Sequence, residues 1–188
     1  PVVDIHTIGA GGGSIASISE SGAILVGPKS AGAYPGPAAY GKGGLQPTVT
    51  DANLVLGRLP QKLLDGQVEL STDAAQHAIQ EHIANPLGIS VQAAAIGILA
   101  IVNETMNNAL KLMTVERGLN PKDFTLVAFG GAGPVHGGEL IRLLGCQKLL
   151  LPRYPGILCA TGLLSTDLKY DFATTRVQRS GKYNEKEV

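Results

Sequence analysis

A strand–turn–helix–strand pattern in the second half of the chain constrains its fold more than any other feature. An apolar run, a glycine turn, a helical stretch and a second apolar run follow one another at residues 125–129, 130–134, 135–144 and 148–151. Two strands joined by a helical crossover pair in parallel, and parallel sheets occur almost only in α/β proteins. The sequence therefore predicts an α/β fold with a locally parallel sheet.

The N-terminal part predicts a strand, a glycine turn and a hairpin. The β-branched run Val2–Ile8 is typical of a strand, and the turn Gly9–Gly13 follows it directly. Ser14–Ile18 and Ala23–Val26 are expected to pair as a hairpin. Residues 27–47 predict a long Gly/Pro/Ala loop. Twelve of the 25 glycines lie within the first 57 residues, which indicates either a loop-rich region or backbone that approaches a ligand closely.

Three helices are expected between this loop and the parallel unit. They cover residues 50–58, where Thr50 or Asp51 supplies the cap, residues 71–84 before Asn85-Pro86, and residues 90–117 before Gly118. A connector at residues 60–70 separates the first two. The first half of the third helix is apolar nearly all round and is expected to be buried, whereas its second half should lie at an edge. A short helix within residues 155–166, a strand at residues 167–178 and a polar tail complete the chain.

Composition excludes several classes of function. The formal net charge is zero and no basic face stands out, so nucleic acid is not an expected partner. Cys146 and Cys159 form no CxxC motif, which argues against a zinc module or a disulfide framework and favours a reducing, cytoplasmic location. The longest apolar run, residues 93–102, is too short to span a membrane. Because the chain opens on a strand pattern without Met, a piece excised from a longer polypeptide is expected.

The turn that follows the first predicted strand is a candidate phosphate site. Consecutive glycines let backbone N–H groups converge on one point, and such a nest binds phosphate oxygens. Gly11, Gly12 and Gly13 are therefore candidate ligand-binding residues, with the hydroxyl of Ser14 as a further group. A tight hairpin turn is the alternative explanation for these glycines.

The second glycine turn lies between a strand and a helix, where a helix N-terminus can bind an anion. Gly130, Gly131 and Gly133 are its candidate binding residues, and Pro134 suits the first helical position. The spacing is neither the GxGxxG dinucleotide motif nor a P-loop. Close packing of the strand on the helix would explain the same glycines.

Three acidic and imidazole side chains are candidates for chemistry. Asp4 and His6 are two residues apart, so on a strand they share one face and could bind a metal or move a proton. Asp51 is a weaker catalytic candidate, because helix capping explains this residue fully. The remaining histidines, His77, His82 and His136, are expected to be exposed.

Four stretches taken together resemble the hydantoinase A / 5-oxoprolinase family, in the family's order and over nearly the whole chain. They are DIHTIGAGGGSIA (4–16), VGPKSAGAYPGPAAYGKGGLQPTVTDANLVLGRL (26–59), ERGLNPKDFTLVAFGGAGPVHGGEL (116–140) and PGILCATGLLSTDLKYDF (155–172). The long loop motif is the most distinctive of the four.

This resemblance implies an actin-like ATPase fold with a ribonuclease-H-like core, of which the chain would be the C-terminal lobe. Residues 1–59 would carry the phosphate loop and the long loop, residues 60–118 a helical segment, residues 119–178 the GGAGP unit and following strands, and residues 179–188 a tail. The glycine turn at residues 9–14 resembles the second phosphate loop, and residues 130–134 resemble the adenosine-side loop. Family members use ATP and Mg²⁺ to open a cyclic amide such as hydantoin or 5-oxoproline, and sister members carboxylate ketones.

The family's N-terminal phosphate motif, a GGTFTD-type hairpin, has no counterpart in this sequence. The isolated chain is therefore expected not to turn over ATP. A B-type subunit or domain and an oligomeric assembly are the partners that the resemblance implies. A ketone carboxylase subunit and a non-catalytic nucleotide-binding module are the alternatives.

Overall fold

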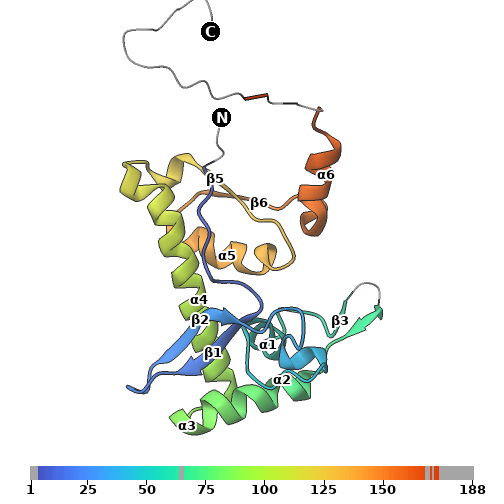
Figure 1. Ribbon diagram of the computed structural model, residues 1–188. Coiled ribbons are helices and arrows are strands. Elements are labelled where there is room, and N and C mark those ends of the chain that lie inside the picture. Colours follow the sequence, from blue (N-terminus) through green and yellow to red (C-terminus); the bar gives the residue numbers. More distant parts are fainter. Residues whose placement is uncertain (1–3, 64–65, 168–169, 171, 174–188) are drawn as a thin grey trace, which may run out of the picture. The chain divides into compact units, whose positions relative to one another are not determined.

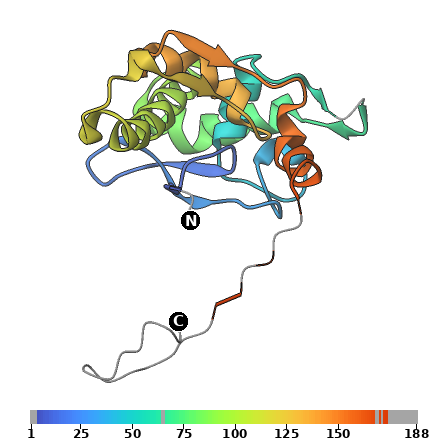
Figure 2. The same ribbon diagram turned by 90° about the horizontal axis from the view of Figure 1, so that it is seen from above.

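The computed structural model describes residues 4–63, 66–167, 170 and 172–173 (Figures 1 and 2). The chain divides into two compact units, residues 1–158 and 159–188. The first unit contains every sheet of the described residues, while the helix α6, Leu158–Leu164, falls almost entirely in the second. The mixed α/β composition confirms the coarse fold class.

The predicted hairpin is confirmed near the N-terminus. Strands β1, Ser14–Ile18, and β2, Ile24–Ser30, pair antiparallel, with Ile18 opposite Ile24 and a register shift between Ser14 and Ala16. The second strand runs four residues beyond the predicted end at Val26, because the glycine and proline at residues 27–28 lie in the register shift and pairing resumes at Ser30.

The parallel unit is also confirmed. Strands β5, Thr125–Val127, and β6, Lys148–Leu150, pair in parallel, and the helix α5, Gly133–Leu144, connects them. The helix ends at Gly145, whose φ of 79° is the left-handed conformation that glycine adopts at low cost. At Gly137 an added Cβ would lie 3.1 Å from the Ala128 side chain, so a glycine here lets the helix pack closely on its strand.

The helical middle of the chain follows the prediction with shifted ends. Helix α1 is Val49–Val55, α2 is Thr72–Ile79, α3 is Asn85–Leu87 and α4 is Val91–Met113. A π-helical turn at Gln80–Ala84 joins α2 to α3, so the helical path passes Pro86 and ends only at Gly88. Short strands β3, Lys62–Leu63, and β4, Val68–Glu69, occupy the predicted connector. Single 3-10 turns lie at Ala38–Tyr40, Val115–Arg117, Pro121–Asp123 and Pro155–Ile157.

Helix α4 connects the two halves of the first unit. It packs on α1 and β2 at one end and on α5 at the other (Figure 1). The main core is built from Val49 and Ala52 of α1, Ile79 of α2, Ile83 of the π-helical turn, and Ala94, Ala95, Ile98, Leu99 and Val102 of α4. The prediction of a buried first half holds on one side of α4 only, since Ile96 is 58% exposed. The second half is not a bare edge, because Asn103 and Asn107 are buried there.

Two predicted strands are absent from the described residues. Residues 4–8 form no strand, although they were expected to continue one from Val2; residues 1–3 lie outside the described range. Asp4 is instead tied by an ion pair to Arg117, and no β-ladder holds this segment. The described positions between 167 and 173 are not in a strand either, and the rest of that prediction and the tail lie outside the described residues.

Within the described residues, no single helix is long and apolar enough to cross a membrane. One bent pair, residues 72–87 with 91–117 at 92° to each other, meets the length and composition criteria together.

The first turn of α1 joins three segments of the fold. The N-cap of helix α1 is Thr48, two or three residues earlier than the expected Thr50 or Asp51, and Thr48 and Asp51 form a reciprocal capping box. The Asp51 carboxylate is fully buried and accepts four hydrogen bonds, from the N–H groups of Ala38, Ala39 and Thr48 and from the Thr48 hydroxyl, at 2.8–3.3 Å. This carboxylate therefore holds the long loop against α1.

Replacing Asp51 with Asn should destabilise the protein by about 2–4 kcal/mol, because the amide places an NH₂ group against at least one buried donor. The free energy of unfolding in urea measures this loss. Asp73→Asn is the matched control, since Asp73 is an exposed aspartate in the first turn of α2, and should change the free energy by less than about 0.5 kcal/mol. Equal and small losses in the free energy of unfolding for Asp51→Asn and Asp73→Asn would contradict the role of Asp51 in holding the long loop against α1.

Candidate functional site

Four of the five carbonyl groups in the first glycine turn, Gly9–Gly13, accept hydrogen bonds. The Gly9 oxygen accepts from the Ser14 hydroxyl at 3.5 Å, and the Gly11 oxygen from the Ser14 N–H at 3.0 Å. The Gly12 oxygen accepts from both the N–H and the hydroxyl of Thr50, each at 2.9 Å. The Gly13 oxygen accepts from the N–H of Ala31 at 2.9 Å. The turn is thus anchored through its acceptors.

The backbone N–H groups of the first glycine turn are largely without hydrogen-bond acceptors among the described residues. The N–H of Gly11 donates to the Ser14 hydroxyl at 2.9 Å, but those of Gly12 and Gly13 donate to no other described residue. In a trans peptide the N–H points opposite to the C=O before it. Because the Gly11 and Gly12 oxygens are held inward, the next two N–H groups are turned outward. Adjacent outward N–H groups form a concave site for an anion.

The second glycine turn offers the open end of a helix. Its Gly130 N–H donates to the Pro155 oxygen at 2.8 Å, which fixes the turn, and α5 then begins at Gly133. The N-cap residue is Ala132, and no side chain caps the helix. Pro134 has no N–H and the Val135 N–H donates to the Ala132 oxygen at 3.1 Å, so the Gly133 N–H is the helical donor left without an acceptor among the described residues, at the positive end of the helix dipole. This end can therefore receive negative charge.

Both glycine turns line one pocket of about 340 Å³, called here the loop pocket. Gly12 and Gly13 form one wall with Gly131 and Ala132 on another, and an added Cβ at Gly12 would lie 3.9 Å from that of Ala132. The long loop and α1 complete the lining with Gly32, Pro37, Tyr40, Thr50 and Asn53, together with Leu59, Leu63 and Val135. The structure therefore brings together two motifs that lie more than a hundred residues apart.

The other candidate binding residues do not line the loop pocket. Ser14 is 4% exposed, its hydroxyl is engaged inside the turn, and it does not line the loop pocket. Gly11 and Gly133 line a neighbouring pocket instead, and Gly130 lines neither. Tyr40 and Asn53 were not singled out in the sequence, and nothing in the local pattern marks them, because only the folded loop places them at the pocket.

The neighbouring pocket, of about 560 Å³, is mainly apolar. It lies between α4, β5, α5 and the segment at residues 4–11. Its apolar lining includes Ile8, Met106, Leu110, Met113, Leu126, Phe129 and Leu140. Its titratable side chains are Asp4, His6 and His136.

The proposed metal pair is not assembled as a metal site. Asp4 forms an ion pair with Arg117, whose hydrogen bond and charge lower the pKa of the Asp4 carboxyl, and the side chain of His6 is exposed. No group of three or more His, Cys, Asp or Glu side chains that could hold a metal occurs within the described ranges. No carboxylate lines the loop pocket, and Asp51 is occupied by backbone donors. The described residues therefore do not by themselves form a magnesium site beside the glycine turns.

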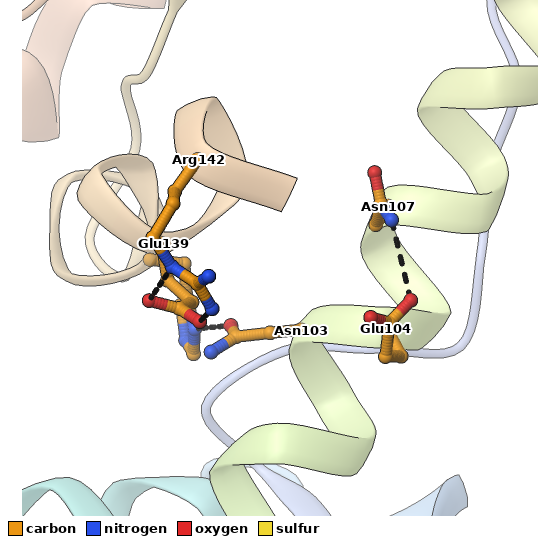
Figure 3. A network of polar contacts seen from close by, with 6 residues as sticks. Asn103, Glu104, Asn107, Glu139 and Arg142 are labelled. Carbon is orange, nitrogen blue, oxygen red and sulfur yellow. Dashed lines mark hydrogen bonds and ion pairs between the residues drawn. The ribbon is translucent and has the colours of Figure 1, made fainter. Parts of the chain in front are cut away.

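His136 is buried, which corrects the prediction of an exposed side chain. It is 2% exposed, and its Nδ1 lies 2.7 Å from Oδ1 of Asn103 on α4, with α5 and α4 facing each other across this contact (Figure 3). Burial, together with the positive charge of Arg58, lowers the pKa of His136. The neutral ring donates from Nδ1, and Nε2 is left as an acceptor with no partner among the described residues.

Further polar side chains surround this contact (Figure 3). Asn107 donates to Glu104 at 3.2 Å on α4, and Glu139 pairs with Arg142 on α5. In the sequence, the polar residues within the apolar pattern of α4 indicate that this helix faces a polar neighbour. The sequence could not identify that neighbour, because the partner lies 33 residues away.

Known proteins of one family are similar to this chain in sequence. The profile described as hydantoinase/oxoprolinase matches residues 1–172. Caprolactamase subunit alpha of Pseudomonas jessenii is 47% identical over 95% of this chain and 26% of its own length. The acetophenone carboxylase gamma subunit of Aromatoleum aromaticum is 44% identical over 90% of this chain and 23% of its own.

Two solved structures have the same fold. The ATP-dependent caprolactamase from Pseudomonas jessenii superposes with a TM-score of 0.81 at 47% identity, covering 90% of this chain and 25% of that one. The nucleotide-free structure of acetone carboxylase gives a TM-score of 0.80 at 33% identity, covering 86% and 23%.

The chain thus has the α/β fold of a segment of two solved enzymes, an ATP-dependent caprolactamase and an acetone carboxylase. The chain belongs to the hydantoinase/oxoprolinase family, as its motifs predicted. It spans about a quarter of the length of the relatives compared above.

The lowered pKa of His136 predicts a dependence of stability on pH. Below its ordinary value of 6.5 the unfolded chain takes up a proton that the folded chain refuses, so stability should fall as the pH drops through this range. The slope from this group should approach about 1.4 kcal/mol per pH unit. Urea unfolding of wild type and His136→Gln between pH 7.5 and about 5 tests this.

The His136→Gln variant should show a shallower fall in the free energy of unfolding than wild type over that range. His77→Gln, which removes an exposed histidine from α2, is the control and should keep the wild-type profile. Parallel profiles of wild type and His136→Gln would show that His136 does not resist protonation in the folded chain.

Proposed function

We propose that this chain is the nucleotide-binding part of an enzyme that uses ATP to open a cyclic amide, such as hydantoin, N-methylhydantoin, 5-oxoproline or a larger lactam. The observation that carries the proposal is the loop pocket, which is lined both by Gly12 and Gly13, whose N–H groups have no acceptor among the described residues, and by residues at the uncapped N-terminus of α5. Outward N–H groups and a helix N-terminus both favour phosphate oxygens. The solved relative named an ATP-dependent caprolactamase supports ATP as the nucleotide and a lactam as the substrate.

The chemistry explains why such a reaction needs ATP. An unstrained amide carbonyl is a poor electrophile. Transfer of the γ-phosphoryl group to the amide oxygen releases ADP and makes that oxygen part of a good leaving group. Water can then attack the carbon, and the C–N bond of the ring breaks as the nitrogen is protonated. Hydrolysis of the acyl phosphate that remains releases phosphate. In this scheme the first glycine turn holds the phosphates and stabilises their charge, and the second glycine turn lies on the adenosine side of the nucleotide.

The finer structural proposal is an actin-like ATPase fold, in which this chain forms one lobe. Mg²⁺, if used, would be held mainly by the phosphates of ATP and by residues outside the described set, since no carboxylate lines the loop pocket. A B-type subunit or domain is the proposed partner, because the caprolactamase and acetophenone carboxylase relatives are named as subunits.

A ketone carboxylase is the second candidate. The acetophenone carboxylase gamma subunit is nearly as similar to this chain as the caprolactamase subunit, at 44% against 47% identity. Both reactions would activate an oxygen by phosphorylation, so the loop pocket suits either one. The substrate decides between them.

Release of ADP by the intact protein with its partner subunit tests the function. Hydantoin, N-methylhydantoin, 5-oxoproline and caprolactam would be offered in turn, followed by acetone or acetophenone with bicarbonate. Stimulation by a cyclic amide is expected. Stimulation only by a ketone with bicarbonate would make the protein a carboxylase. ADP binding without stimulation by any of these compounds would favour a non-catalytic nucleotide-binding module.

Gly131→Ala should weaken ADP binding roughly tenfold, which corresponds to about 1.4 kcal/mol. The added methyl group meets no protein atom within 4 Å, so it leaves the fold intact and takes up space in the loop pocket. Isothermal titration of the intact protein with ADP measures the change. Gly138→Ala, an exposed helical glycine with equally open surroundings, is the control and should bind as wild type does. Unchanged affinity in Gly131→Ala would contradict the placement of the nucleotide.

A further inference from the structure

We propose that Thr50 is a positioning residue that sets the direction of the phosphate-binding N–H group of Gly13. The inference rests on the proposed function, since it assigns a ligand to the loop pocket. Thr50 donates twice to one acceptor, the Gly12 oxygen, from its N–H and from its hydroxyl, each at 2.9 Å. Two donors converging on one carbonyl fix the rotation of that peptide more firmly than one would.

The direction of the Gly13 N–H follows from this contact. The peptide between Gly12 and Gly13 is planar and trans, so its C=O and N–H point in opposite directions. With the oxygen held against α1, the N–H faces away from α1, on the side where no described residue accepts a hydrogen bond from it. A glycine peptide without this contact rotates easily, because neither residue carries a Cβ.

Thr50 can act in this way because its own position is fixed. It lies in the first turn of α1, directly between the two partners of the capping box, Thr48 and Asp51. Thr48 is fully buried and bridges to Ile15 of β1, and Asp51 is tied to Ala38 and Ala39. The residue that orients the glycine turn is therefore held by both the hairpin and the long loop.

The close approach of the Thr50 hydroxyl is a second constraint that favours glycine at position 12. An added Cβ at this position would lie 2.8 Å from the Thr50 hydroxyl oxygen, a distance that real Cβ atoms do not tolerate. Any larger residue would push the hydroxyl away from the Gly12 oxygen. The glycine and the threonine are thus fitted to each other before any ligand binds.

The test compares ADP and adenosine binding by the intact protein in variants at Thr50. Thr50→Val keeps the shape and the backbone N–H but removes the hydroxyl, so ADP affinity should fall roughly tenfold, whereas adenosine, which has no phosphate, should bind as it does to wild type. Thr50→Ser restores the hydroxyl and should return ADP affinity to within about twofold of wild type. Thr105→Val is the control, because Thr105 makes an equivalent hydroxyl-to-carbonyl bond of 3.0 Å on the exposed side of α4.

The outcomes separate this inference from the proposed function. Wild-type ADP affinity in Thr50→Val would overturn the positioning role and leave the nucleotide site standing. Equal loss in Thr50→Val and Thr50→Ser, or equal loss of ADP and adenosine, would show a general packing effect and would also overturn it. Failure of wild-type protein to bind ADP would overturn both proposals. Thermal unfolding of the nucleotide-free variants checks that each is folded.

Discussion

The buried carboxylate of Asp51 is the interaction on which the rest of the site depends. A buried charge is tolerated only when it is compensated, and here two backbone N–H groups of the long loop and two donors of Thr48 provide the compensation. The same contacts fix where α1 begins and where the loop lies. The glycine turn is attached to this junction through Thr50, so a single helical turn places three segments around the loop pocket.

The parts of the fold that were predictable are those specified by local pattern. The hairpin and the parallel unit were predicted because strand alternation, glycine turns and helix caps are encoded within a few residues. Gly12, Gly13 and Gly131 were predicted as binding residues on the same basis, and the structure places them around one pocket. The nucleotide itself still rests on the proposed function.

The parts that were not predicted depend on contacts between distant residues. The burial of His136 requires Asn103, and the conformation at residues 4–8 involves Arg117, more than a hundred residues along the chain. Ser14 shows a subtler limit. Its type suits phosphate binding, but a small hydroxyl directly after a glycine turn can equally bond to the backbone beside it, and here it does. Residue type alone does not distinguish these two uses.

In the glycine turn the carbonyl groups bond to the protein and the N–H groups are left for a ligand. This arrangement explains how a flexible sequence can bind a ligand well. A run of glycines loses more conformational entropy on ordering than other residues do, and a loop ordered only by its ligand would bind weakly. In this chain the carbonyl groups are ordered by Ser14, Ala31 and Thr50 during folding, without the ligand. The N–H groups of Gly12 and Gly13 are thereby fixed in direction before the proposed anion binds. Preorganised donors of this kind need no rearrangement as charge develops on a transferring phosphoryl group, which is the property that the proposed reaction requires.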